Sequence, residues 1–201
     1  MGLQISLPGL ESPQAGGDVL FFAALPDPRA ALKMHELAWR LRARHQLPSK
    51  PMPAERLHVT LQTLGAFDGV PEEAMALADR VAGRLAVAPF EVCFDRAMSF
   101  SGSGGPEVQR AYVLRESQRS EELMNLHLLL TRGLRALGQP ATGGRAFAAH
   151  VTLLYDPRRV AEEPVEPIRW TVDTLVLIRS QVGSGKPYQI LRRWQLPTLS
   201  S

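Results

Sequence analysis

The chain has 201 residues, of which 45% are hydrophobic, 21% are charged and 6% are aromatic. This composition excludes a disordered chain and a collagen-like repeat, and it suits a globular protein that buries about 70% of its unfolded surface. No stretch approaches the length of apolar sequence that a membrane span needs, so no membrane partner is expected. The formal charge of +3 is too small to predict nucleic-acid binding by itself. The single cysteine, Cys93, excludes an intramolecular disulfide, as expected for a protein of the cytoplasm.

The first half of the chain predicts a flexible arm over residues 1–17, followed by a strand, a helix and a second strand. The compact apolar run over 18–25 ends at two prolines and predicts the first strand. Apolar residues then recur at helical spacing as far as about Gln46. The β-branched and apolar run over 57–64 predicts the next strand.

The order strand, helix, strand returns in the second half, after a predicted helix from about Pro71 to Leu85 and a strand over 90–100. Corresponding strands of the two halves begin about 90 residues apart. The second set comprises a strand over 108–115, a helix between Ser120 and Gly138, a strand over 147–155 and a final hairpin of strands over 171–178 and 188–194.

We therefore predict an α+β fold in which residues 18–201 form a single bilobal domain. A pseudo-twofold axis would relate the two lobes. Each lobe would contribute one of two mostly antiparallel sheets, flanked by outer helices, and a central cleft would lie between them.

A short motif occurs once in each half. Residues 57–61 read Leu-His-Val-Thr-Leu, and residues 149–153 read Ala-His-Val-Thr-Leu, so the two histidines are 92 positions apart (150 minus 58). Side chains two positions apart in a strand share a face and lie roughly 6.5–7 Å apart. Each strand would therefore present one imidazole and one hydroxyl to the cleft. The candidate site residues are His58, Thr60, His150 and Thr152.

Two facing histidines suit acid and base catalysis at phosphorus. Because the unperturbed pKa of histidine is about 6.5, one imidazole can act as a base while the other, protonated beside a bound anion, acts as an acid. The hydroxyl groups of Thr60 and Thr152 can donate hydrogen bonds to phosphate oxygens. The pattern predicts an in-line displacement at phosphorus that uses no metal and no other cofactor.

A structural role is the usual interpretation of a single His-x-Thr in an apolar strand, but its recurrence in equivalent strands favours a functional one. A metal held by His58 and His150 would need a further ligand, and the neighbouring threonines are poor zinc ligands. No metal site is therefore predicted. The remaining histidines are interpreted as structural: His35, His45 and His127.

Other chemistry-bearing side chains carry weaker signals. Cys93 alternates with apolar residues in a predicted strand and has no histidine near it in sequence, so it is not predicted to be a nucleophile. Three aromatic residues could stack on a nucleobase, with burial in the core as an equal alternative: Phe22, Tyr155 and Tyr188.

Around the two motifs, the sequence resembles the 2H phosphoesterase superfamily, and within it the RNA 2',3'-cyclic phosphodiesterases, also called 2'-5' RNA ligase-like proteins. The resemblance spans about 18–198 and includes the first apolar strand, the Leu-Gly pair after the first motif and the C-terminal run over 188–196. Such proteins commonly carry phenylalanine where this chain has Thr63, and an Ala-Arg pair where it has Leu154 and Tyr155.

The resemblance implies a bilobal fold and metal-independent opening of a 2',3'-cyclic phosphate at the end of an RNA or oligonucleotide. The product would be a 2'-phosphate, and the reverse reaction would be 2'-5' RNA ligation. The resemblance also implies that His58 donates the proton to the leaving 3'-oxygen and that His150 accepts the proton of the attacking water.

Two alternatives stay open from the sequence. One is a nucleotide or RNA-end binding module that uses the same cleft without turnover. The other is a phosphodiesterase for another cyclic phosphodiester, such as ADP-ribose 1'',2''-cyclic phosphate. For the RNA 2',3'-cyclic phosphodiesterase we expect a monomer.

Overall fold

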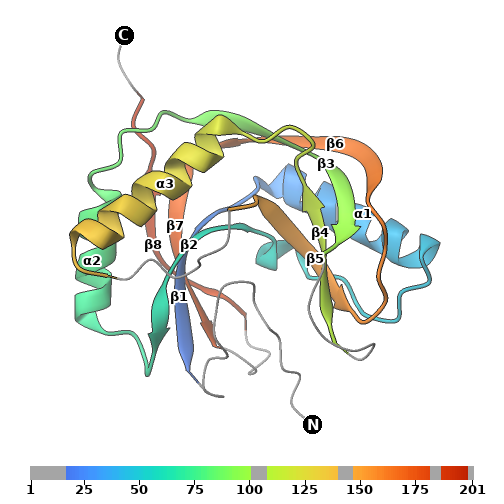
Figure 1. Ribbon diagram of the computed structural model, residues 1–201, viewed down its shortest axis with the longest axis horizontal. Helices are drawn as coiled ribbons and strands as arrows, with labels where there is room; N and C mark the ends of the chain where they lie inside the picture. The colour runs from blue at the N-terminus through green and yellow to red at the C-terminus, as the bar shows by residue number, and fades with distance from the viewer. Residues whose placement is uncertain (1–16, 101–107, 140–146, 182–186, 199–201) are drawn as a thin grey trace.

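The computed structural model describes residues 17–100, 108–139, 147–181 and 187–198. Over these residues the chain forms one eight-stranded antiparallel sheet with the order β6-β3-β4-β5-β2-β1-β7-β8 (Figure 1). The helices are α1 (Pro28–Arg44), α2 (Glu72–Ala82) and α3 (Glu121–Ala136), with a short 3-10 helix η1 (Ala54–Arg56). The strands are β1 (Asp18–Ala24), β2 (Val59–Phe67), β3 (Phe90–Ser99), β4 (Arg110–Arg115), β5 (His150–Asp156), β6 (Glu163–Val172), β7 (Thr174–Gln181) and β8 (Gln189–Gln195).

The α+β class and the mostly antiparallel strand arrangement are confirmed. The two predicted sheets are the two halves of one sheet, β6-β3-β4-β5 and β2-β1-β7-β8. The halves meet at β2 and β5, where the strand pairing consists of Val59 opposite Val151. Such a narrow junction explains why each half reads in the sequence as a sheet of its own.

The helices that follow β1 and β4 cross over to opposite halves of the sheet. Helix α1 contacts β5 and β6, whereas α3 contacts β2. Figure 1 shows α1 on the half of the sheet that contains β5 and β6, and α2 and α3 on the half that contains β2. All three helices contribute to one apolar core with the same face of the sheet. Within the described residues, no helix is long and apolar enough to cross a membrane.

Strand β1 is buried along its whole length because both of its faces are covered. Leu20 and Phe22 belong to the core beneath the helices, whereas Val19 and Phe21 pack with Ile178 on the opposite face. This double burial accounts for the uninterrupted apolar run in the sequence, which lacks the alternation of a half-exposed strand.

Strand β6 is absent from the elements predicted above, so the start of the strand predicted over 171–178 is wrong. The rest of that strand is β7, which pairs with β8 as the predicted hairpin. The chain reverses at Asp173, between the end of β6 and the start of β7. Pro164 and Pro167 interrupt the strand pattern of β6, and the sheet accommodates them because β6 is an edge strand. Two predicted features lie outside the described residues: most of the N-terminal arm and most of the turn between β7 and β8.

Ser120 caps α3 as predicted, because its Oγ accepts a hydrogen bond from the backbone N–H of Leu123 at 3.1 Å. We expect Ser120→Ala to lower the free energy of unfolding by about 1 kcal/mol, since that N–H then loses its acceptor. Ser120→Asn keeps an acceptor and should retain most of the stability. Chemical denaturation measures both effects, and equal losses in the two variants would contradict the capping role.

Candidate active site

The antiparallel pairing of Val59 with Val151 brings the two motifs together at the junction of the sheet halves. Both valines are fully buried and face the core beneath the helices. Their neighbours in each strand therefore lie on the opposite face of the sheet. Continuing this register sets His58 across from Thr152 and Thr60 across from His150, the two strands being related by a local twofold.

Each histidine is held by the same local hydrogen bond. Nδ1 of His58 lies 2.8 Å from the carbonyl oxygen of Arg56, and Nδ1 of His150 lies 2.8 Å from that of Ala148. A carbonyl oxygen can only accept, so Nδ1 carries the proton in both rings. Nε2 of each neutral imidazole is then left as a proton acceptor.

A β-bulge follows each motif at the same position. Leu61 follows Thr60 and has no opposite residue in β1, and Leu153 follows Thr152 and has no opposite residue in β4. A bulge shifts the alternation of side chains by one residue. Residues that would otherwise face the helices are thereby turned to the histidine face beyond the bulge.

The residues turned in this way are Thr63 and Tyr155, which stand at equivalent places in the two halves, 92 positions apart (155 minus 63). Thr63 lies opposite Phe21 in β1, and the Phe21 ring contacts His58. The Thr152 hydroxyl hydrogen-bonds with Tyr155 and lowers the pKa of its phenol, although burial dominates and raises that pKa to about 12. Two of the three residues that depart from the family pattern, Thr63 and Tyr155, therefore lie beside the motifs, whereas Leu154 is buried in the core.

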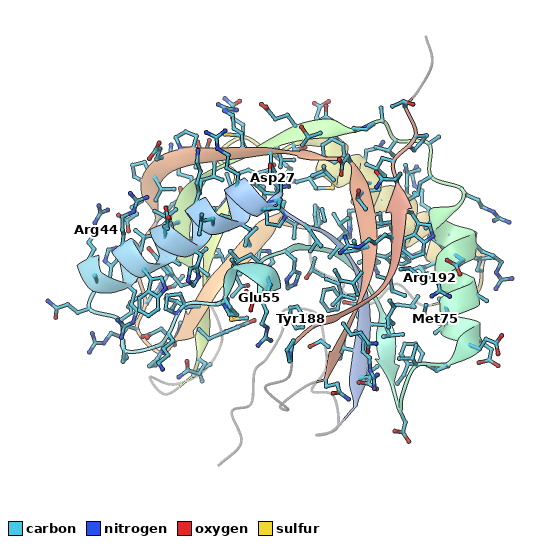
Figure 2. All side chains as sticks on the ribbon, turned by 180° about the vertical axis from the view of Figure 1, so that it is seen from behind. Asp27, Arg44, Glu55, Met75, Tyr188 and Arg192 are labelled. Carbon is cyan, nitrogen blue, oxygen red and sulfur yellow. The ribbon has the colours of Figure 1, made fainter. Side chains whose placement is uncertain are left out.

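Aromatic rings lie against both imidazoles. The rings of Phe21 and Tyr188 have their centroids 5.2 Å from that of His58, and the Phe100 ring has its centroid 4.7 Å from that of His150. Figure 2 shows Tyr188 near Glu55 of η1, between the two halves of the molecule. These apolar neighbours exclude water from the sides of the imidazoles and restrict their rotation.

Burial is the main influence on the charge of the two histidines. It lowers the pKa of His58 to about 4, against the effect of the hydrogen bond to the Arg56 carbonyl, and the positive charges of His150 and Arg56 lower this pKa further. Burial also lowers the pKa of His150. Both imidazoles are therefore mostly neutral at pH 7 when no ligand is bound. The effect of His150 on His58 also places the two rings within electrostatic reach of each other.

The three histidines interpreted as structural each make a contact elsewhere in the fold. Nδ1 of His35 lies 2.9 Å from the Met52 carbonyl oxygen, and Nδ1 of His127 lies 2.6 Å from the Leu61 carbonyl oxygen. His45 hydrogen-bonds with Glu163. The structural interpretation agrees with these contacts.

The remaining candidates divide between core and site. Phe22 is fully buried in the core, so its proposed stacking on a base is wrong. Tyr155 and Tyr188 are only partly buried and lie at the site. Burial raises the pKa of the Cys93 thiol, which disfavours a reactive thiolate. In the part of the chain that the structure describes, no cluster of three metal-ligating side chains occurs.

The family follows from a direct comparison. Residues 25–184 match the family model of the 2'-5' RNA ligase superfamily. The chain belongs to this superfamily. The matched segment includes both His-x-Thr motifs and both bulges, so the repeated geometry described above lies within the family domain.

Similar members of the 2'-5' RNA ligase superfamily carry a common name. The RNA 2',3'-cyclic phosphodiesterase of Escherichia coli is 30% identical over 182 residues, which are 88% of this chain and 96% of that protein. The protein of the same name from Thermus thermophilus is 32% identical over 166 residues, covering 73% of this chain and 75% of its own. The crystal structure of Escherichia coli LigT complexed with 3'-AMP has a TM-score of 0.71 and 28% identity, covering 90% of this chain and 99% of that one.

Proposed function

We propose that this superfamily member is a hydrolase that opens the terminal 2',3'-cyclic phosphate of RNA or a short oligonucleotide to a 2'-phosphate. The observation that carries the proposal is the duplicated arrangement at the sheet junction. Each half supplies an imidazole whose Nδ1 is held by a carbonyl oxygen, which leaves Nε2 as the proton acceptor, together with one threonine hydroxyl on the same face. The shared name of the two relatives supports the choice of substrate.

Hydrolysis needs one proton taken up and one delivered. Nε2 of His150 accepts a proton from the attacking water as its oxygen bonds to phosphorus, and Nε2 of His58 gives its proton to the 3'-oxygen as the bond from that oxygen to phosphorus breaks. The family resemblance supplies this direction. An anionic phosphate between the two neutral rings raises their pKa values, so its binding favours the protonated state that the acid requires.

The threonine hydroxyls supply the remaining contacts. In the proposed complex, Thr60 and Thr152 donate hydrogen bonds to the non-bridging oxygens of the phosphate, where negative charge increases during the attack. Proton transfer and charge stabilisation are then both provided by side chains. The proposed mechanism therefore uses no metal and no cofactor.

One copy of the chain supplies both histidines and both threonines, which supports a monomer as the active form. The single thiol, Cys93, is free, and a protein with a free thiol suits a reducing compartment. We propose a cytoplasmic location on that ground.

The lowered pKa values predict an acidic optimum for kcat/KM, which reports the ionisations of the free protein. The reaction needs one imidazole protonated and the other neutral. Both pKa values lie below the ordinary 6.5, that of His58 at about 4, so a pair with one protonated imidazole is populated on the acidic side of pH 6.5. We expect a bell-shaped profile with its maximum below pH 6.5, because the second proton is lost as the pH rises further. A maximum at or above neutral pH would contradict the pKa values.

The substrate is tested by comparing rates in excess EDTA. We expect rapid opening of an oligonucleotide with a terminal 2',3'-cyclic phosphate and slow opening of ADP-ribose 1'',2''-cyclic phosphate. Faster turnover of the second compound would establish a different cyclic phosphodiester as substrate. Nucleotide binding without turnover of either compound, retained after substitution of both histidines, would establish a binding module instead.

A further inference from the structure

The Arg56 side chain lies beside the histidine pair with part of its hydrogen-bonding capacity unused. Its Nε is buried and has no hydrogen-bond partner among the described residues. No ion pair within that same part of the chain includes Arg56. A buried donor without a partner costs free energy, and in native proteins this situation commonly marks a group that a ligand or water completes.

Tyr188 fixes where the guanidinium lies. The guanidinium carbon of Arg56 lies 4.4 Å from the centroid of the Tyr188 ring, and that ring contacts His58. The charge also reaches Tyr155 on the other half of the sheet, where it lowers the pKa of the phenol. The cation is therefore held between the two halves and next to the first motif.

We propose that Arg56 binds the phosphate group of the substrate, with Tyr188 as the platform that orients its guanidinium. The inference rests on the proposed function, because it concerns the same site. A planar guanidinium with several N–H donors matches two oxygens of a phosphate, and stacking on an aromatic ring limits the rotations that binding must freeze. The two histidines and two threonines include no permanent cation, so Arg56 supplies the fixed positive charge that an anionic substrate needs.

The backbone of Arg56 also contacts the first motif histidine. Its carbonyl oxygen accepts the hydrogen bond from Nδ1 of His58. One residue then sets both the orientation of the imidazole and the position of the anion. Among the described residues, Arg179 also has a buried Nε without a hydrogen-bond partner, but its charge is paired with the carboxylate of Asp18 at 2.7 Å and is therefore already neutralised within the fold.

The test is the affinity for adenosine 2'-phosphate and for adenosine, measured by NMR titration of the full chain. Arg56→Gln is expected to weaken binding of adenosine 2'-phosphate about 10- to 100-fold, since a hydrogen-bonded charge pair is lost. Adenosine has no phosphate, so its affinity should stay the same. Arg56→Lys keeps the charge without the planar fork and should give an intermediate loss for the phosphate ligand.

Arg80→Gln is the matched control, because it removes the same charge from an exposed position on α2, on the far side of the sheet. It should leave both affinities unchanged. Equal affinity for adenosine 2'-phosphate in wild type and folded Arg56→Gln, or no binding by wild type, would overturn the inference. An Arg56-dependent affinity in a protein that opens no cyclic phosphate would leave the inference standing and refute the proposed function.

Discussion

His58→Ala and His150→Ala should each lower kcat/KM for opening of a nucleoside 2',3'-cyclic phosphate by roughly 10²- to 10⁴-fold, the usual contribution of a general acid or base. Each substitution removes the Nε2 that carries a proton in the proposed mechanism. The fold should survive, because both side chains lie on the sheet face away from the helices and are only partly buried. The double variant should be little worse than either single variant, since acid and base act in one step.

His45→Ala is the control for loss of an imidazole. His45 lies at the C-terminal end of α1 and contacts Glu163, not the motifs. It should retain full activity. Full activity in a folded His58→Ala or His150→Ala variant would refute the role of the pair.

The residual activity of the single variants also assigns the two roles. With His58 as the acid, His58→Ala should lose the decline of kcat/KM at high pH and keep the decline at low pH. His150→Ala should show the reverse, because the remaining acid must stay protonated. An exchanged pattern would exchange the roles of the two histidines.

Thr60→Val and Thr152→Val are expected to lower kcat by roughly 10²-fold each, in the range measured for loss of one donor to a developing oxyanion. Valine has the shape of threonine without the hydroxyl, and both positions are in strands, where valine is favoured. The stability should therefore change little. KM should change less than kcat if the hydrogen bonds strengthen in the transition state.

Thr171→Val tests whether the hydroxyl-to-methyl change has a general effect, since Thr171 is exposed on the edge strand β6. Its kcat should match that of wild type. Two valine variants at the motifs with unchanged kcat would show that the hydroxyl groups do not contact the reacting phosphate.

The sequence predicted those parts of the site that depend on strand alternation alone. A strand places every second side chain on one face, so the two His-x-Thr motifs sufficed to place an imidazole and a hydroxyl together in each half. The repeat of the motif after 92 residues also predicted the internal symmetry. Helix α3 was also predicted from the sequence, because its leucines recur at helical spacing after the Ser120 cap.

The sequence did not predict the features that arise from pairing between distant strands. The bulges at Leu61 and Leu153 appear only when β2 is aligned with β1 and β5 with β4, and they determine that Thr63 and Tyr155 face the histidines. The sequence did not single out Arg56, because the position of its guanidinium depends on the ring of Tyr188, which lies far along the chain. The edge position that lets β6 contain prolines is likewise a property of the assembled sheet.

The central claim is that two imidazoles on neighbouring strands open a cyclic phosphate without a metal. The most direct test follows adenosine 2',3'-cyclic phosphate by ³¹P NMR in the presence of the wild-type protein, with and without excess EDTA. We predict that adenosine 2'-phosphate forms at the same rate in both samples. Loss of turnover with EDTA, or formation of adenosine 3'-phosphate, would contradict this mechanism.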